Sequence, residues 1–196
     1  MSSNSLFDGV ENPNGFFLAA FGPVFLAAIP LTSYITAPNS FVQSAVETLL
    51  ALIPGSNSIA PDRVIPALSA VYIFWTFAAT GAASAAALGA GNKGALDNNH
   101  PRQHINSLRG LPLRMRSAHY NILEMFPGFA LAAALAQVTA PANQNVINLL
   151  GLHVLLKTVV YYPAYVFDIA PLRSLAHVGA TASVINVAWK LATGAL

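Results

Sequence analysis

Long hydrophobic runs, separated by short polar segments, dominate this chain. The last four runs cover residues 64–90, 117–139, 145–167 and 172–195, and an earlier run covers residues 16–36. A helix needs about 20 apolar residues to cross a hydrocarbon core of about 30 Å. Each run is therefore predicted to be a membrane-spanning helix. Pro23 and Pro30 should kink the first one.

Residues 41–53 follow a different pattern and are too few to cross a membrane. Apolar residues recur there at helical spacing, opposite a polar face that contains Gln43, Ser44, Glu47 and Thr48. This pattern is typical of an amphipathic helix in the membrane interface, and a loop packed on the bundle is the alternative. Residues 1–63 thus form an N-terminal extension before a four-helix domain at residues 64–196.

The connections between the last three runs constrain how the helices pack. They are only APANQ at residues 140–144 and DIAP at residues 168–171, so successive helices must be antiparallel neighbours. The small-residue run AATGAASAAALGAG at residues 78–91 should allow close helix packing. The predicted fold is all-α: an antiparallel four-helix membrane bundle with an extra N-terminal transmembrane helix and a short amphipathic helix.

The composition supports a multi-pass integral membrane protein. Hydrophobic residues make up 55% of the chain and charged residues only 8%. The formal net charge of +2 is small, and no nucleic-acid partner is predicted. The absence of cysteine excludes disulfides and cysteine metal sites. Residues 1–15 carry no Lys or Arg, so we expect the first span to be retained and not removed as a signal peptide.

The basic residues concentrate in one loop, residues 91–116. Five of the nine in the chain lie there, namely Lys93, Arg102, Arg109, Arg114 and Arg116. The positive-inside rule places this loop in the cytoplasm. The span at 145–167 must then return to the same side, where Asp168 and Arg173 follow it. We therefore expect Tyr165 to lie near the membrane depth of Glu124.

Polar residues converge at this depth on two helices. Asn121 and Glu124 lie one turn apart on one face of the span at 117–139. A polar stripe on the returning helix consists of Lys157, Tyr161, Tyr165 and Asp168. An ionisable residue inside a span costs roughly 2.5 to 3.5 kcal/mol and needs a partner or a water-filled cavity. The two stripes, beside Arg116 and Arg173, predict a polar cavity.

Structural roles would explain the same residues. Glu124 could pair with Lys157 or an arginine and fix the helix register, and the tyrosines could form an interfacial belt. The loop arginines could contact anionic lipid. His153 and His177 lie on otherwise apolar helices, where a bond to a neighbouring backbone carbonyl is expected.

No metal site is predicted. Asp97, His100 and His104 share the basic loop, but their spacing is too loose for a metal-ligand pattern, and we expect solvated side chains.

Three segments carry a resemblance to a known family: DNNHPRQ, then RSAHYNILEMFP, then YYPAYVFDIAPLRSL. Together they resemble the membrane-associated proteins in eicosanoid and glutathione metabolism (MAPEG), in particular their bacterial and fungal-type branch, over residues 64–196. The resemblance implies a homotrimer that binds glutathione between subunits near the cytoplasmic side. It also implies an endomembrane or endoplasmic-reticulum location in a eukaryote, or the inner membrane in a bacterium.

The resemblance further implies a role for particular residues. The glutathione-binding set would be Arg116, His119, Asn121, Glu124, Tyr161 and Tyr165. His119 takes the place of a residue that reaches glutathione across the subunit boundary. Arg173 corresponds to the arginine that activates the glutathione thiol, and a nearby guanidinium does stabilise a thiolate.

Three functions are compatible with these features. The first is a glutathione transferase or peroxidase that acts on lipophilic electrophiles or lipid hydroperoxides. The second is a non-catalytic member that binds membrane lipid or serves as a structural subunit of a larger membrane assembly, which the N-terminal helix would contact. The third is an enzyme that modifies an apolar metabolite without glutathione.

The charge distribution gives a testable topology. Residues 91–116 and the N-terminus should face the cytoplasm, and Asn145 the opposite side. Single cysteines placed at Gln103 and Gln144 of this cysteine-free chain should react with an impermeant maleimide from opposite faces of sealed vesicles. Labelling of both from one face would contradict this topology.

Overall fold

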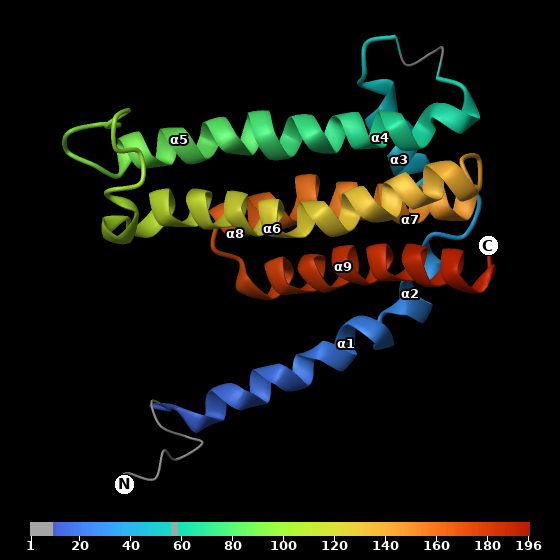
Figure 1. Ribbon diagram of the computed structural model, residues 1–196, viewed down its shortest axis with the longest axis horizontal. Coiled ribbons are helices and arrows are strands. Elements are labelled where there is room, and N and C mark those ends of the chain that lie inside the picture. Colours follow the sequence, from blue (N-terminus) through green and yellow to red (C-terminus); the bar gives the residue numbers. More distant parts are fainter. Residues whose placement is uncertain (1–9, 56–58) are drawn as a thin grey trace, which may run out of the picture.

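The computed structural model describes residues 10–55 and 59–196, and this part of the chain is helical without any strand (Figure 1). The all-α fold class is thereby confirmed. The elements in chain order are η1 (Pro13–Phe21), α1 (Gly22–Ala27), α2 (Ile29–Ile35), α3 (Phe41–Ala51), η3 (Pro61–Arg63), α4 (Val64–Ile73), η4 (Phe74–Ala79), α5 (Thr80–Ala90), η5 (Ile105–Ser107), α6 (Gly110–Thr139), α7 (Gln144–Leu155), η6 (Leu156–Tyr161), α8 (Tyr162–Val166) and α9 (Ala170–Thr193).

The short elements combine into long rods, which lie side by side in Figure 1. Among the described residues, four stretches are long and apolar enough to cross a membrane: Pro13–Ile35, Pro61–Ala90, Gly110–Thr139 and Gln144–Val166. Leu131 and Val138 on α6 are among the exposed apolar side chains. These features make the chain an integral, multi-pass membrane protein.

Helix α9 completes the antiparallel bundle and is more polar than the other four stretches. At 24 residues it is about 36 Å long, enough to cross the hydrocarbon core. Its Ser183 and Asn186 side chains are buried against the other helices. These two polar side chains of α9 are thus directed into the protein, where α2, α6, α7 and η6 contact the helix.

Helix α6 begins earlier than the hydrophobic pattern predicts, at Gly110 instead of residue 117. Its 30 residues extend over about 45 Å, about ten residues more than the hydrocarbon core requires. Arg114 and Arg116 lie on this extension, before the apolar part of the helix. The hydrophobic pattern missed this start, because the polar residues there give no hydrophobic period.

Two contacts fix the register between α6 and the returning rod of α7, η6 and α8. The Arg114 Nε donates to the Val166 carbonyl at 2.9 Å, so the start of α6 and the end of α8 do share one depth, as predicted. Lys157 Nζ donates to Asn121 Oδ1 at 3.1 Å. The Tyr165 ring lies 5.6 Å from the Tyr161 ring, and Tyr161 is close enough to Glu124 for an electrostatic interaction, so the match in depth between Tyr165 and Glu124 stays a prediction.

The small-residue run packs against α6 on one side. Thr80, Ser84 and Ala87 of α5 are buried there, while Ala82 and Ala86 stay exposed in this chain. Close approach of α5 and α6 follows from these short side chains, as the sequence predicted.

Polar hydrogen bonds attach the N-terminal span to the bundle. Asn186 Nδ2 donates to Thr32 Oγ1 at 3.0 Å and to Ser33 Oγ at 2.8 Å, and Asn148 Nδ2 donates to the Thr36 carbonyl at 3.0 Å. All of these bonds involve the end of the span near α2. Helix α1 ends at Ala27, close to the predicted kink at Pro30, and the chain before it diverges from α9 (Figure 1).

The predicted amphipathic helix is confirmed as α3, and its apolar face packs against α7. Val42, Val46 and Leu50 are buried in this contact. Gly151 of α7 makes the approach possible, because a methyl group at this glycine would collide with the Val46 side chain.

We predict that Gly151→Ala destabilises the protein by about 1 to 3 kcal/mol, because β-branched Val46 cannot rotate away from the added methyl. Gly128→Ala in α6 is the matched control, since an added methyl there meets no atom within 4 Å. Thermal unfolding in detergent measures both variants. Val46→Ala should restore part of the loss in the Gly151→Ala background. Equal melting temperatures for the two glycine variants would contradict the close contact between α3 and α7.

Candidate functional site

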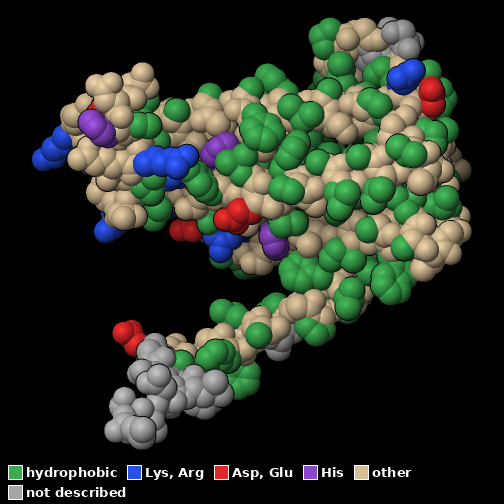
Figure 2. All heavy atoms as spheres, viewed as in Figure 1, with side chains coloured by type: hydrophobic (Ala, Val, Ile, Leu, Met, Phe, Trp, Pro, Cys, Tyr) green, Lys and Arg blue, Asp and Glu red, His purple; other side chains and the backbone are tan. Residues whose placement is uncertain are grey.

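A cavity of about 580 Å³ opens between the bundle and the N-terminal segment. Figure 2 shows the groove between these two parts, with acidic, basic and histidine side chains on its bundle side. Its polar lining consists of Asn121, Tyr161, Tyr165, Arg173, Ser174 and His177, and its apolar lining of Leu18, Phe21, Val24, Phe25, Leu175 and Val178. Its volume lies within the range of ligand pockets, about 300 to 1,000 Å³.

Lys157 lies directly behind the polar wall and is fully buried. Its Nζ is 3.1 Å from Asn121 Oδ1 and 3.1 Å from His177 Nδ1, and it lies 4.1 Å from the centre of the Tyr161 ring. These three partners come from α6, α9 and η6. The lysine therefore holds together the three elements that carry most of the polar lining.

The donor pattern of Lys157 decides what its partners present to the cavity. A protonated Lys157 only donates hydrogen bonds, and in that state Asn121 Oδ1 and His177 Nδ1 both accept. The Asn121 amide nitrogen and the His177 Nε2–H then remain as donors. Since both residues line the cavity, this wall favours ligand groups that accept hydrogen bonds.

The two helix histidines differ from each other. His153 Nδ1 lies 2.9 Å from the Ala180 carbonyl, so the predicted backbone bond is confirmed there. His177 instead binds Lys157, and the prediction for it was wrong. The reason is that η6 and α9 cross at this point, which brings a charged side chain within reach.

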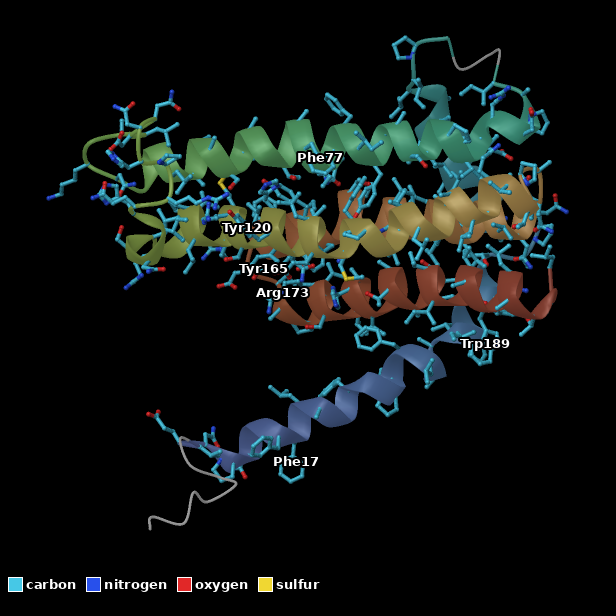
Figure 3. All side chains as sticks on the ribbon, in the orientation of Figure 1. Phe17, Phe77, Tyr120, Tyr165, Arg173 and Trp189 are labelled. Carbon is cyan, nitrogen blue, oxygen red and sulfur yellow. The ribbon has the colours of Figure 1, made fainter. Side chains whose placement is uncertain are left out.

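Arg173 reaches the cavity through a tight turn between α8 and α9. The N–H groups of Asp168 and Ile169 donate to the Tyr165 and Ala164 carbonyls, at 3.2 and 2.8 Å, which is the hydrogen-bond pattern of a Schellman motif. Asp168 occupies the left-handed position with φ of 62°. The turn folds Arg173 back over the Tyr165 ring, with its guanidinium carbon 4.6 Å from the ring centre (Figure 3).

The other three predicted site residues lie outside this cavity lining. His119 Nδ1 is 2.9 Å from Thr80 Oγ1 and so faces α5. The Arg116 guanidinium lies 4.3 Å from the centre of the Tyr120 ring. Glu124 is exposed, although near enough to Tyr161 for an electrostatic interaction. One chain thus brings together Asn121, Tyr161, Tyr165 and Arg173, but not these three.

Arg116, Tyr120 and Glu124 follow at four-residue spacing along one face of α6, and we call them the α6 polar stripe. Within residues 10–55 and 59–196, Glu124 forms no hydrogen bond or ion pair, and Lys157 is bonded elsewhere. The structural alternative in which Lys157 satisfies Glu124 is therefore not found in the described chain. A carboxylate near the membrane surface is left available for another partner.

The loop histidine His100 pairs with its neighbour Asp97, Nδ1 to Oδ2 at 3.1 Å. The Asn99 N–H and the His100 side chain, which both bond to this carboxylate, lower the pKa of Asp97. In the part of the chain that the structure describes, no three His, Cys, Asp or Glu side chains are grouped to hold a metal ion.

Sequence reasoning did not assign His177 or the N-terminal segment to the site. His177 lies four residues after Arg173, so it shares a face of α9 with the predicted arginine. That spacing was the available signal. No comparable signal marked Leu18, Phe21, Val24 or Phe25, because their position depends on how α1 lies against α9.

Fold and site together define a multi-pass helical membrane protein with a polar cavity beside its spans. The model of the MAPEG family matches residues 65–193, about two thirds of the chain. The chain therefore belongs to the MAPEG family, a superfamily of eicosanoid and glutathione metabolism. Neither the curated proteins nor the solved structures contain a match to this chain. The family match begins after the N-terminal segment and α3.

The turn that places Arg173 gives a stability prediction. Asp168→Val should be less stable than Asp168→Gly by about 1 to 2 kcal/mol, because a β-branched residue is strained in the left-handed region and glycine is not. The pair is matched, since both variants lose the carboxylate that lies 3.8 Å from Arg114. Thermal unfolding measures the difference. Equal stability of the two variants would show that this turn is not left-handed.

Proposed function

We propose that the protein is a glutathione-dependent transferase or peroxidase that acts on lipophilic electrophiles or lipid hydroperoxides. The observation that carries this proposal is the convergence of Asn121, Tyr161, Tyr165 and Arg173 on one cavity with an apolar side. A family match alone would leave the function open. A polar wall and an apolar wall in one cavity suit a reaction between a polar thiol and a membrane-soluble partner.

The residues fit glutathione chemically. This peptide carries two carboxylates and two amide carbonyls, and its thiol supplies the nucleophile or reductant when it is bound. Asn121 and His177 offer N–H donors, the tyrosines offer hydroxyls, and Arg173 offers a guanidinium. Such a set of donors matches a ligand that is rich in acceptors.

Arg173 is the residue that we assign to thiol activation. A free thiol has a pKa near 8.5, and a fixed positive charge close by favours the thiolate. Arginine suits this task because its guanidinium keeps its own proton. Stacking on Tyr165 holds the side chain over the cavity and restricts its rotamers.

Glu124 is assigned to the glutathione ammonium, and the α6 polar stripe supports a homotrimer. The carboxylate is exposed and has no partner among the described residues, which is costly near the hydrocarbon core. A neighbouring subunit would cover the stripe and bring ligand groups to it. Arg116 and His119, which lie outside the cavity of one chain, would then act at the subunit boundary.

A non-catalytic function as a lipid-binding or structural subunit is the second candidate. It is favoured by the N-terminal span Pro13–Ile35, which is almost entirely exposed. Phe16, Phe17 and Leu26 present a long apolar surface that lipid or another membrane protein would cover. In that case the cavity would hold lipid and Arg173 would have no thiolate to stabilise.

We predict that Glu124→Gln weakens glutathione binding by about 1.5 to 3 kcal/mol, the range for a hydrogen bond to a charged group. Glutamine keeps the size of the side chain but removes its charge. Calorimetric titration measures the affinity, and Glu47→Gln on the surface of α3 is the control. Unchanged affinity together with a lower melting temperature would identify Glu124 as a structural residue.

Arg173→Leu should act differently from Glu124→Gln. The affinity for glutathione should stay closer to normal, while the thiolate absorbance of the bound peptide at neutral pH and the rate constant should fall. Arg109→Leu in the basic loop serves as a control for loss of an exposed cation. A wild-type protein that forms no thiolate with glutathione would contradict the proposed function and favour the structural or lipid-binding alternative.

A further inference from the structure

The N-terminal segment forms the wall of the cavity opposite the polar residues. Leu18, Phe21, Val24 and Phe25 all line the cavity, and they come from η1 and α1. Leu18, Phe21 and Phe25 follow at intervals of three and four residues and therefore share one helical face. All four residues lie outside residues 65–193, where the family match is found.

We propose that this segment, which we call the N-terminal wall, determines which apolar ligands the cavity accepts. The proposal deepens the proposed function, since it concerns the lipophilic partner in the same cavity. Its side chains carry no hydrogen-bonding group, while the facing wall carries donors from Asn121, Arg173 and His177. The geometry thus assigns the reactive polar end of a ligand to the bundle and its alkyl chain or ring to the N-terminal wall.

The N-terminal wall is attached to the bundle at its α2 end, and near its middle it contacts the polar side of the cavity. Asn186 and Asn148 bond to the α2 end of the span. Phe25 meets His177 edge to face, with 5.9 Å between the ring centres. Phe21 and Leu18, which precede this contact in the chain, line the same cavity as Arg173 and Leu175. Shortening a side chain there enlarges the space for the apolar part of the ligand.

Phe21 and Phe17 provide a matched pair for a test. Both are exposed phenylalanines of η1, but Phe21 lines the cavity, whereas Phe17 is outside the lining and points away from the bundle (Figure 3). Phe21→Ala and Phe17→Ala therefore remove the same apolar side chain from one helix, inside the cavity lining in the first case and outside it in the second. Their effects on the lipid-facing surface should be similar, while their effects on the cavity should differ.

The substrate test uses conjugation of glutathione to α,β-unsaturated aldehydes with short and long alkyl chains. Phe21→Ala should change the ratio of kcat/KM for long over short chains in favour of long chains by about tenfold, mainly through KM for the aldehyde. Phe17→Ala should leave the ratio within about twofold of wild type, and glutathione affinity should be unchanged in both. Equal ratios for the two variants would overturn the proposal.

A cross-linking test does not depend on any activity. Cysteines introduced by Val24→Cys and Val178→Cys face the same cavity, so a short bismaleimide should link them in membranes. Phe17→Cys with Val178→Cys is the control pair and should remain unlinked. Absence of the first cross-link, or equal linking of both pairs, would overturn the proposal that the N-terminal wall lines the cavity. A protein that forms the expected cross-link but conjugates no aldehyde would instead refute the transferase function.

Discussion

A polar group inside a membrane must find its partners within the protein, and this constraint organises the site around Lys157. No water in the hydrocarbon core can solvate an ammonium group, so the protein supplies Asn121, His177 and the Tyr161 ring. These partners belong to three different elements. The same contacts that satisfy the lysine therefore set the spacing of α6, η6 and α9, and they turn two further donors toward the cavity.

The same need to satisfy buried polar groups explains how the N-terminal span is attached near the opposite end of α9. Asn186 and Asn148 would be unsatisfied in an apolar bundle, and they bond to the residues around α2. Interhelical hydrogen bonds of this kind contribute about 0.6 to 2 kcal/mol each in membranes. They fix one end of the segment, the helix break after Ala27 redirects the other, and an apolar wall then faces the polar residues.

Features that depend on local residue spacing could be predicted from the sequence. Side-chain contacts that depend on how distant helices cross could not. Hydrophobic runs marked the spans, and a four-residue period placed Tyr161 and Tyr165 on one side of their rod, where both line the cavity. The partner of His177 depends on how α9 lies against the π-helical segment η6, which carries Lys157. His119 faces α5, which no pattern within α6 alone could indicate.

The central claim is that the cavity between the N-terminal segment and the bundle is a glutathione site. Its most direct test is a cryo-electron microscopy map of the protein in lipid nanodiscs with saturating glutathione. The account predicts peptide density in the cavity, in contact with Asn121 and Arg173, and a neighbouring subunit over the α6 polar stripe. Density for a lipid chain in the cavity, with glutathione absent from it, would contradict the claim.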